Sequence, residues 1–118
     1  MLKIFCLFST FAVVYSLLGG LQSHPKLASE ASDKFQQALQ SVIKFEFAEK
    51  AGFQPKKFDL ISYKTQIVAG TNYFAKVEID DGKYAHLRIF EPLPYTKRPM
   101  QLHSYQLEKG LGDEIDYF

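Results

Sequence analysis

The chain has 118 residues, of which 47% are hydrophobic and 15% aromatic, and its 14 Lys and Arg residues face 13 Asp and Glu residues. This length supports one hydrophobic core and would leave two cores marginal, so the composition excludes a disordered chain and predicts a single globular domain. The even balance of charge excludes the basic footprint that nucleic acid or an anionic lipid surface requires, and Lys56-Lys57 and Lys97-Arg98 are interpreted as solvated loop charges.

The first 16 residues have the pattern of a secretory signal. Lys3 precedes an apolar run, and the residues that end at Ser16 are of the small or β-branched kinds that signal peptidase tolerates. The run is about 15 residues long, shorter than the roughly 20 that a membrane-spanning helix needs. We therefore predict a cleaved signal at residues 1–16 and a mature domain at residues 17–118, with a retained N-terminal membrane helix as the alternative.

The sequence lacks the residue patterns of enzymes and metal sites. Cys6 is the only cysteine and lies in the predicted signal, so the mature chain has no disulfide, thiol nucleophile or thiolate ligand. None of His24, His86 and His103 has a partner at metal-ligand spacing, and no Ser or Gly-rich motif predicts a nucleophile elbow or a phosphate loop. We expect neither an enzyme nor a bound cofactor or metal.

A mobile leader and one helix come first along the chain. Gly19–Ala28 has little periodicity and predicts an extended, mobile segment. The pattern becomes helical from Ser32, whose hydroxyl can cap the helix, to Lys50, and Gly52 and Pro55 end the helix. Four residues lie along one line of this helix, Phe35, Leu39, Val42 and Glu46, with Ala38, Ile43 and Phe45 beside it, and the apolar members form the predicted stripe.

Four β-strands are predicted after the helix, because the hydrophobic period falls to two and β-branched and aromatic residues become frequent. Asp80-Asp81-Gly82 predicts a tight hairpin turn, and strands joined this way pair antiparallel. The fold class is α+β, with one long helix packed on an antiparallel sheet of four to five strands. The predicted strands are 60–65, 71–79, 84–91 and 100–108.

Three segments in a fixed order carry a resemblance to a known family. They are the Gly pair Gly19-Gly20, the hairpin tip Gln66-Ile67-Val68-Ala69-Gly70 and the loop that begins at Leu93-Pro94. With the absence of cysteine from the mature chain, they resemble the cystatin superfamily and, within it, the stefins. The resemblance is strongest from Tyr63 to Leu93 and extends over the predicted mature chain.

The resemblance implies a cystatin-like fold and a reversible, tight-binding inhibitor of papain-like cysteine proteases of the cathepsin L, B and S types. It implies a wedge in which the leader fills the non-primed subsites, the first hairpin covers the centre of the cleft near the catalytic cysteine, and the second loop contacts the primed side. The protease-binding residues that it implies are Leu17, Leu18, Gly19, Gly20, Gln66, Ile67, Val68, Ala69, Gly70, Leu93, Pro94 and Tyr95.

The residues themselves support a partner, since apolar side chains at hairpin tips have no reason to be exposed on a monomer. The alternatives are a non-inhibitory binding module of the same fold, or an ordinary turn, linker and strand end. Stefins act inside cells, whereas the predicted signal favours secretion, with the cytoplasm as the alternative. We expect a monomer, and strain at Val68 would favour a strand-exchanged dimer.

Overall fold

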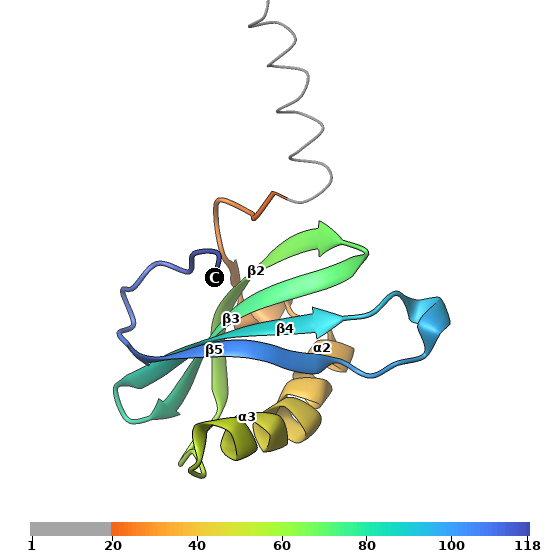
Figure 1. Cartoon of the computed structure of the whole chain (residues 1–118). Helices are drawn as coiled ribbons and strands as arrows, with labels where there is room; N and C mark the ends of the chain where they lie inside the picture. The colour runs from red at the N-terminus through yellow and green to blue at the C-terminus, as the bar shows by residue number, and fades with distance from the viewer. Residues whose placement is uncertain (1–19) are drawn as a thin grey trace, which may run out of the picture.

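The computed structural model describes residues 20–118, which form a five-stranded antiparallel sheet wrapped around a helix (Figure 1). Every strand pairs with its neighbours along the chain, in the order β1-β2-β3-β4-β5. The four predicted strands are confirmed; three of them are longer than predicted, and the last is shifted by one residue. The strands are β1 Lys26–Leu27, β2 Asp59–Val68, β3 Gly70–Asp80, β4 Lys83–Glu91 and β5 Gln101–Lys109. No helix within residues 20–118 is long and apolar enough to span a bilayer.

The one strand beyond the four predicted ones is β1, the first along the chain, and it lies in the segment predicted to be mobile. Lys26 pairs with Tyr63 of β2, and Gln22 makes two hydrogen bonds with Thr65: its N–H donates to the Thr65 carbonyl at 3.3 Å, and its side-chain oxygen accepts from the Thr65 N–H at 3.1 Å. The prediction of a mobile segment is therefore wrong for residues 22–27. The order of this segment comes from a long-range contact. Without β1, the outer edge of β2 would have unpaired backbone N–H and C=O groups.

The helix begins and ends where its capping residues predict. The Ser32 hydroxyl accepts a hydrogen bond from the Phe35 N–H at 3.1 Å, and Gly52 ends the helix in the left-handed conformation with φ of 84°. A short 3-10 turn, η1 Ala28–Glu30, precedes the helix. The helix itself has three consecutive parts, α2 Asp33–Ala38, the π-helical η2 Leu39–Ile43 and α3 Lys44–Ala51.

The predicted apolar stripe of the helix is partly wrong. The buried residues Phe35, Leu39, Ile43 and Phe47 recur every four positions, whereas Phe45 is 64% exposed and Val42 is also exposed. In a regular α-helix a four-residue repeat drifts by about 40° per step, because each residue turns the helix by about 100°. The wider π-helical turn in the middle of the stripe counters this drift and keeps the four side chains facing the sheet.

The core lies between this stripe and the inner face of the sheet. The Phe35 ring stacks on the Tyr73 ring at 4.1 Å between centroids, and Phe47 packs against Phe58 at 5.5 Å. Register shifts near Ile61 in β2 and in the β4–β5 pair mark bulges, which increase the local twist. These bulges let the sheet wrap around the helix (Figure 1).

The C-terminal segment, residues 110–118, covers the outer face of the sheet. The Lys76 ammonium donates hydrogen bonds to the backbone carbonyls of Leu111 and Asp113, and the Phe74 ring contacts the rings of Tyr117 and Phe118. Ile115 is buried in the same segment. Sequence analysis predicted no element there, because the contacts that hold the segment join residues at least 35 positions apart.

Candidate functional site

The first loop is the tip of the β2–β3 hairpin. Val68 pairs with Gly70, so Ala69 alone forms the turn. Ile67 is 55% exposed, and Val68 and Ala69 are also exposed. The Asn72 side-chain amide donates a hydrogen bond to the Gln66 side-chain oxygen at 3.0 Å, which fixes Gln66 beside its cross-strand neighbour. The predicted tip is therefore a short turn that presents apolar side chains to solvent.

Val68 does not have the left-handed backbone that would be one source of strain at the tip. Among residues 20–118, the only non-glycine residues with positive φ are Lys97 and Glu108. The positive φ at the tip belongs to Gly70, at 129°. A positive φ at Val68 therefore does not contribute to the strain that would favour a strand-exchanged dimer.

Gly70 joins the first loop to the end of β4. It is buried, and a Cβ atom at this position would lie 2.5 Å from the Glu91 carbonyl oxygen and 2.8 Å from the Phe90 ring. The neighbouring pair Thr71 and Glu91 confirms that the base of the first loop lies beside the last residue of β4. A side chain at residue 70 would push the two loops apart, because real Cβ atoms do not approach a backbone oxygen so closely.

The second loop connects β4 to β5 and contains a single 3-10 turn, η3 Pro94–Thr96. Leu93 and Pro94 are exposed, and Tyr95 is 79% exposed. The backbone N–H and the hydroxyl of Thr96 both donate to the Leu93 carbonyl, at 3.0 and 2.8 Å. These bonds and the neighbouring prolines give the loop one defined shape.

A polar network beneath the loops was missed by sequence analysis. The Tyr73 hydroxyl donates to one Glu91 carboxylate oxygen at 3.0 Å, and the Lys34 ammonium lies 3.0 Å from the other. Burial and the bond to Glu91 raise the pKa of Tyr73 well above its usual value, so its hydroxyl stays protonated and remains a donor. The network ties the helix and β3 to the residue at which the second loop begins. No local sequence signal could reveal it, because its members lie in three separate elements.

The leader approaches the first loop from the side of β2. Gly20 is half-buried, and the Gln22–Thr65 hydrogen bonds hold the following residues against the strand that leads to the tip. Leu17, Leu18 and Gly19 lie outside the described residues. Figure 1 shows the β2–β3 tip and the β4–β5 loop at the same end of the sheet. We call the exposed residues of these two loops, Ile67, Val68, Ala69, Leu93, Pro94 and Tyr95, the apolar edge.

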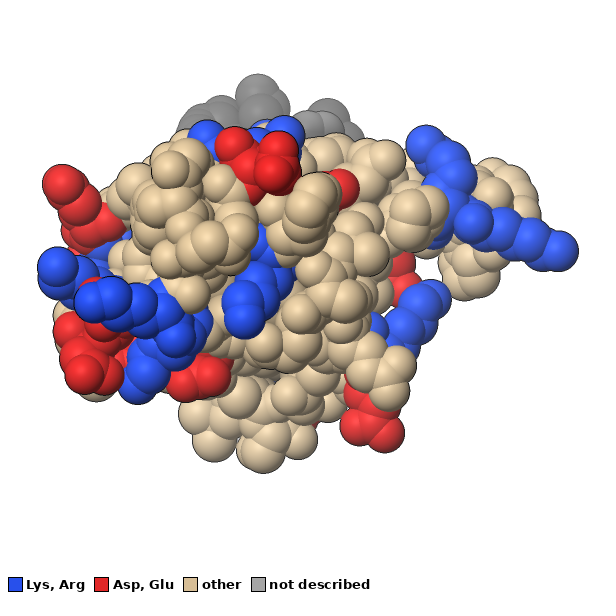
Figure 2. Space-filling model, turned by 90° about the horizontal axis from the view of Figure 1, so that it is seen from below, with Lys and Arg blue, Asp and Glu red and all other residues tan. Residues whose placement is uncertain are grey.

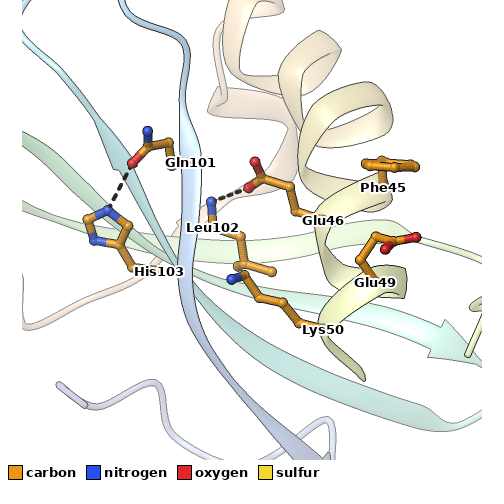
Figure 3. A pocket seen from close by; sticks show the side chains of 7 residues that line it. All are labelled: Phe45, Glu46, Glu49, Lys50, Gln101, Leu102 and His103. Atoms are coloured by element: carbon orange, nitrogen blue, oxygen red, sulfur yellow. Dashed lines mark hydrogen bonds between the residues drawn. The ribbon is translucent and has the colours of Figure 1, made fainter. Parts of the chain in front are cut away.

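A groove of about 420 Å³ lies between α3 and β5 (Figure 3). The Glu46 carboxylate accepts the Leu102 backbone N–H at 2.7 Å, which satisfies a donor on the outer edge of β5. Figure 3 shows Phe45 and Glu49 on the side of the helix turned away from the strand, so the acidic groups do not converge. The described part of the chain also contains no group of three potential metal ligands. The groove is therefore a packing feature and shows no catalytic arrangement.

The family model and the similar proteins all point to one family. The model of one protein family, the cystatin domain, matches residues 23–112. Cystatin-B of Bos taurus is 42% identical over 82 residues, which cover 70% of this chain and 84% of that protein. Cystatin-B of Homo sapiens is 39% identical over 82 residues with the same coverage, and Cystatin-A1 of Sus scrofa is 37% identical over 82 residues, which cover 70% and 80%.

Proposed function

Because the chain belongs to the cystatin family, which consists of cysteine protease inhibitors and not of enzymes, we propose that it is a reversible, tight-binding inhibitor of papain-like cysteine proteases. The proposed targets are proteases of the cathepsin L, B and S types. The apolar edge enters the active-site cleft and excludes substrate, while the leader occupies the non-primed subsites.

The observation that carries this proposal is the apolar edge itself. Ile67, Val68, Leu93 and Tyr95 are exposed on two loops whose bases are packed together at Gly70 and Glu91. Exposing this much apolar surface at one end of a small domain has a cost in water that only a partner removes. Aromatic and aliphatic side chains on a stiff support are also the usual anchors of tight interfaces.

The geometry supports affinity without cleavage. The loops are held by their own hydrogen bonds, so binding orders few groups and little entropy opposes association. A substrate must lie extended across the catalytic thiolate, whereas the peptide bonds around Ala69 turn back between paired strands. The tip can therefore fill the centre of the cleft without placing a scissile bond at the nucleophile.

In this proposal the leader lengthens the time for which the inhibitor stays bound to the protease. The Gln22–Thr65 bonds hold the leader against β2 at residue 22 before binding, and Leu17 and Leu18 would supply apolar contact area. Deletion of the leader through Gly20 should raise the dissociation rate more than it lowers the association rate. Stopped-flow measurement of both rates with papain checks this, and an unchanged dissociation rate would exclude a binding role for the leader.

A titration of papain tests the proposed function. The protein should abolish hydrolysis of a fluorogenic peptide at close to an equimolar ratio. Val68→Asp should shift the end point or weaken inhibition strongly, since a charge would be desolvated in the cleft. Phe45→Asp is the matched control, because Phe45 is an exposed apolar residue of the helix and belongs to neither loop. Papain that stays fully active in excess protein would reject inhibition and favour a non-inhibitory binding module.

We also propose that the protein is secreted after removal of residues 1–16. The support is the charged and apolar pattern of this segment, which lies outside the described residues. Expression in a cell with a secretory pathway should give protein in the medium whose N-terminal sequence begins at Leu17. Protein that stays in the cytoplasm and begins at Met1 would contradict the proposal.

We propose that the protein acts as a monomer. Support comes from the tip, where Val68 has no left-handed backbone that strand exchange would relieve. Size-exclusion chromatography with light scattering should give a single species of monomer mass before and after heating. A stable dimer that no longer inhibits papain would show that the hairpin opens after all.

A further inference from the structure

Two basic residues lie at the end of the second loop, next to the apolar edge. Lys97 and Arg98 follow η3 directly, and both are exposed. Figure 2 shows basic side chains at the outermost end of the molecule, where the β4–β5 loop projects. This placement differs from that of ordinary solvated charges, because the proposed function puts this loop against the protease.

Hydrogen bonds define the backbone conformation of these two residues. Lys97 has φ of 56° and ψ of 22°, a left-handed conformation, and its N–H donates to the Pro94 carbonyl at 3.1 Å. The Arg98 N–H donates to the Thr96 hydroxyl at 3.3 Å, and Pro99 restricts the residue before it to extended conformations. A left-handed lysine costs about 1 kcal/mol relative to a regular conformation, so the loop carries strain where its charges are presented.

Neither residue has an acidic partner within residues 20–118, where the ion pairs of the structure involve Lys34, Lys56 and Lys57. The second loop also lacks any Asp or Glu from Leu93 to Pro99. The predicted mature chain carries 13 basic and 13 acidic residues, so it has no net charge with which to steer a partner. Any electrostatic preference must therefore come from local charges such as this pair.

We propose that Lys97 and Arg98 recognise an acidic rim beside the primed half of the target's cleft, so that the inhibitor favours papain-like proteases with carboxylates at that rim. This inference rests on the proposed function. Charges at the border of an interface chiefly raise the association rate and suppress partners of like charge. The stiff loop adds to the effect, because its backbone needs little ordering on contact and only the two side chains must be ordered.

The test uses papain in two engineered forms, with two surface positions beside the primed subsites changed either to Glu or to Lys. Association rates are measured by stopped flow at about 10 mM and about 1 M salt, where the Debye length is about 30 Å and about 3 Å. The unmodified inhibitor should associate about tenfold faster with the Glu form at low salt. This ratio should fall towards one at high salt.

The variant Lys97→Asn/Arg98→Gln removes both charges and keeps the loop shape, since Asn tolerates the left-handed conformation. It should reduce the low-salt ratio to about twofold or less, and Arg98→Gln alone should give an intermediate ratio. The matched control is Lys56→Gln/Lys83→Gln, which changes the net charge equally. Lys83 begins β4, roughly 27 Å from the strand end that leads to the second loop, and the control should keep the full ratio.

Each outcome decides the inference. A ratio that stays near tenfold in Lys97→Asn/Arg98→Gln overturns it, and so does a control that lowers the ratio as much as this variant. If the unmodified protein inhibits neither form of papain at either salt concentration, the proposed function fails and this inference fails with it. If the protein inhibits both forms of papain and associates with them at equal rates, the recognition of an acidic rim is overturned and the proposed function stands.

Discussion

Gly70 cannot carry a side chain, because its φ of 129° disfavours L-residues and its Cα hydrogen faces the Glu91 carbonyl. Gly70→Ala should lower the free energy of unfolding by about 3 kcal/mol or more, from backbone strain and the clash together. Gly82→Ala is the matched control: its φ is 69°, but nothing lies within 4 Å of the added methyl group. The control should cost about 1 kcal/mol. Urea unfolding measures both, and equal costs would contradict the close contact between the two loops.

His86 gives the fold a defined sensitivity to acid. The imidazole is buried, and its Nε2 atom has no hydrogen-bond partner among the described residues. Burial and the cations of Lys76 and Lys109 lower its pKa from 6.5 to about 4, against a smaller opposing effect of the Asp113 and Asp116 carboxylates. At a pH between the folded-state pKa of about 4 and the ordinary pKa of 6.5, the unfolded chain binds a proton at His86 that the folded chain does not. Stability should therefore fall by roughly 2 to 3 kcal/mol from pH 7 to pH 4.5.

The variant His86→Gln isolates this effect. A neutral side chain cannot titrate, so the free energy of unfolding should change much less between pH 7 and pH 4.5, whatever the variant's absolute stability. Asp113, whose pKa is lowered mainly by the hydrogen bond from the Gly110 N–H, loses its contribution below this window. Urea unfolding at several pH values measures how the free energy of unfolding of the unmodified protein and of His86→Gln depends on pH. Parallel slopes for the two proteins would show that His86 does not cause the acid sensitivity.

At the scale of elements, the sequence pattern predicted the structure correctly where the signal was local. The Ser32 cap, the Gly52 end and the turn at Gly82 were predicted correctly, because each depends on a few neighbouring residues. It failed for β1 and the C-terminal segment, which are ordered only by contacts with β2 and the outer face of the sheet. The helix stripe was shifted because the prediction assumed regular α-helical geometry and the structure has a π-helical turn.

The corrected stripe predicts a sharp contrast between adjacent residues. Ile43 is fully buried and Val42 is exposed. Ile43→Ala should lower the free energy of unfolding by about 2 to 5 kcal/mol through the cavity that it leaves. Val42→Ala should change it by about 0.5 kcal/mol or less. Thermal or urea unfolding compares them, and a larger cost for Val42→Ala would restore the originally predicted stripe.

At the scale of the whole molecule, the two loops lie at one end of the sheet, and the hairpin turn at Asp80-Asp81-Gly82 lies at the other. The motif residues of the loops could be found from the sequence, together with their exposure. Their packing at Gly70 and the support from Glu91 could not, since both depend on the register of β3 against β4. The end of the molecule that carries the two loops is thus built by contacts between residues that are distant in the chain.

Hydrogen exchange of the free protein and of its equimolar mixture with papain, followed by mass spectrometry, tests most directly whether this end of the molecule is the binding surface. Amides in residues 66–72 and 93–98 should exchange more slowly in the mixture, whereas the turn at residues 80–83 and the exposed face of the helix should be unchanged. Slower exchange at the turn or the helix, or no change anywhere, would contradict the account.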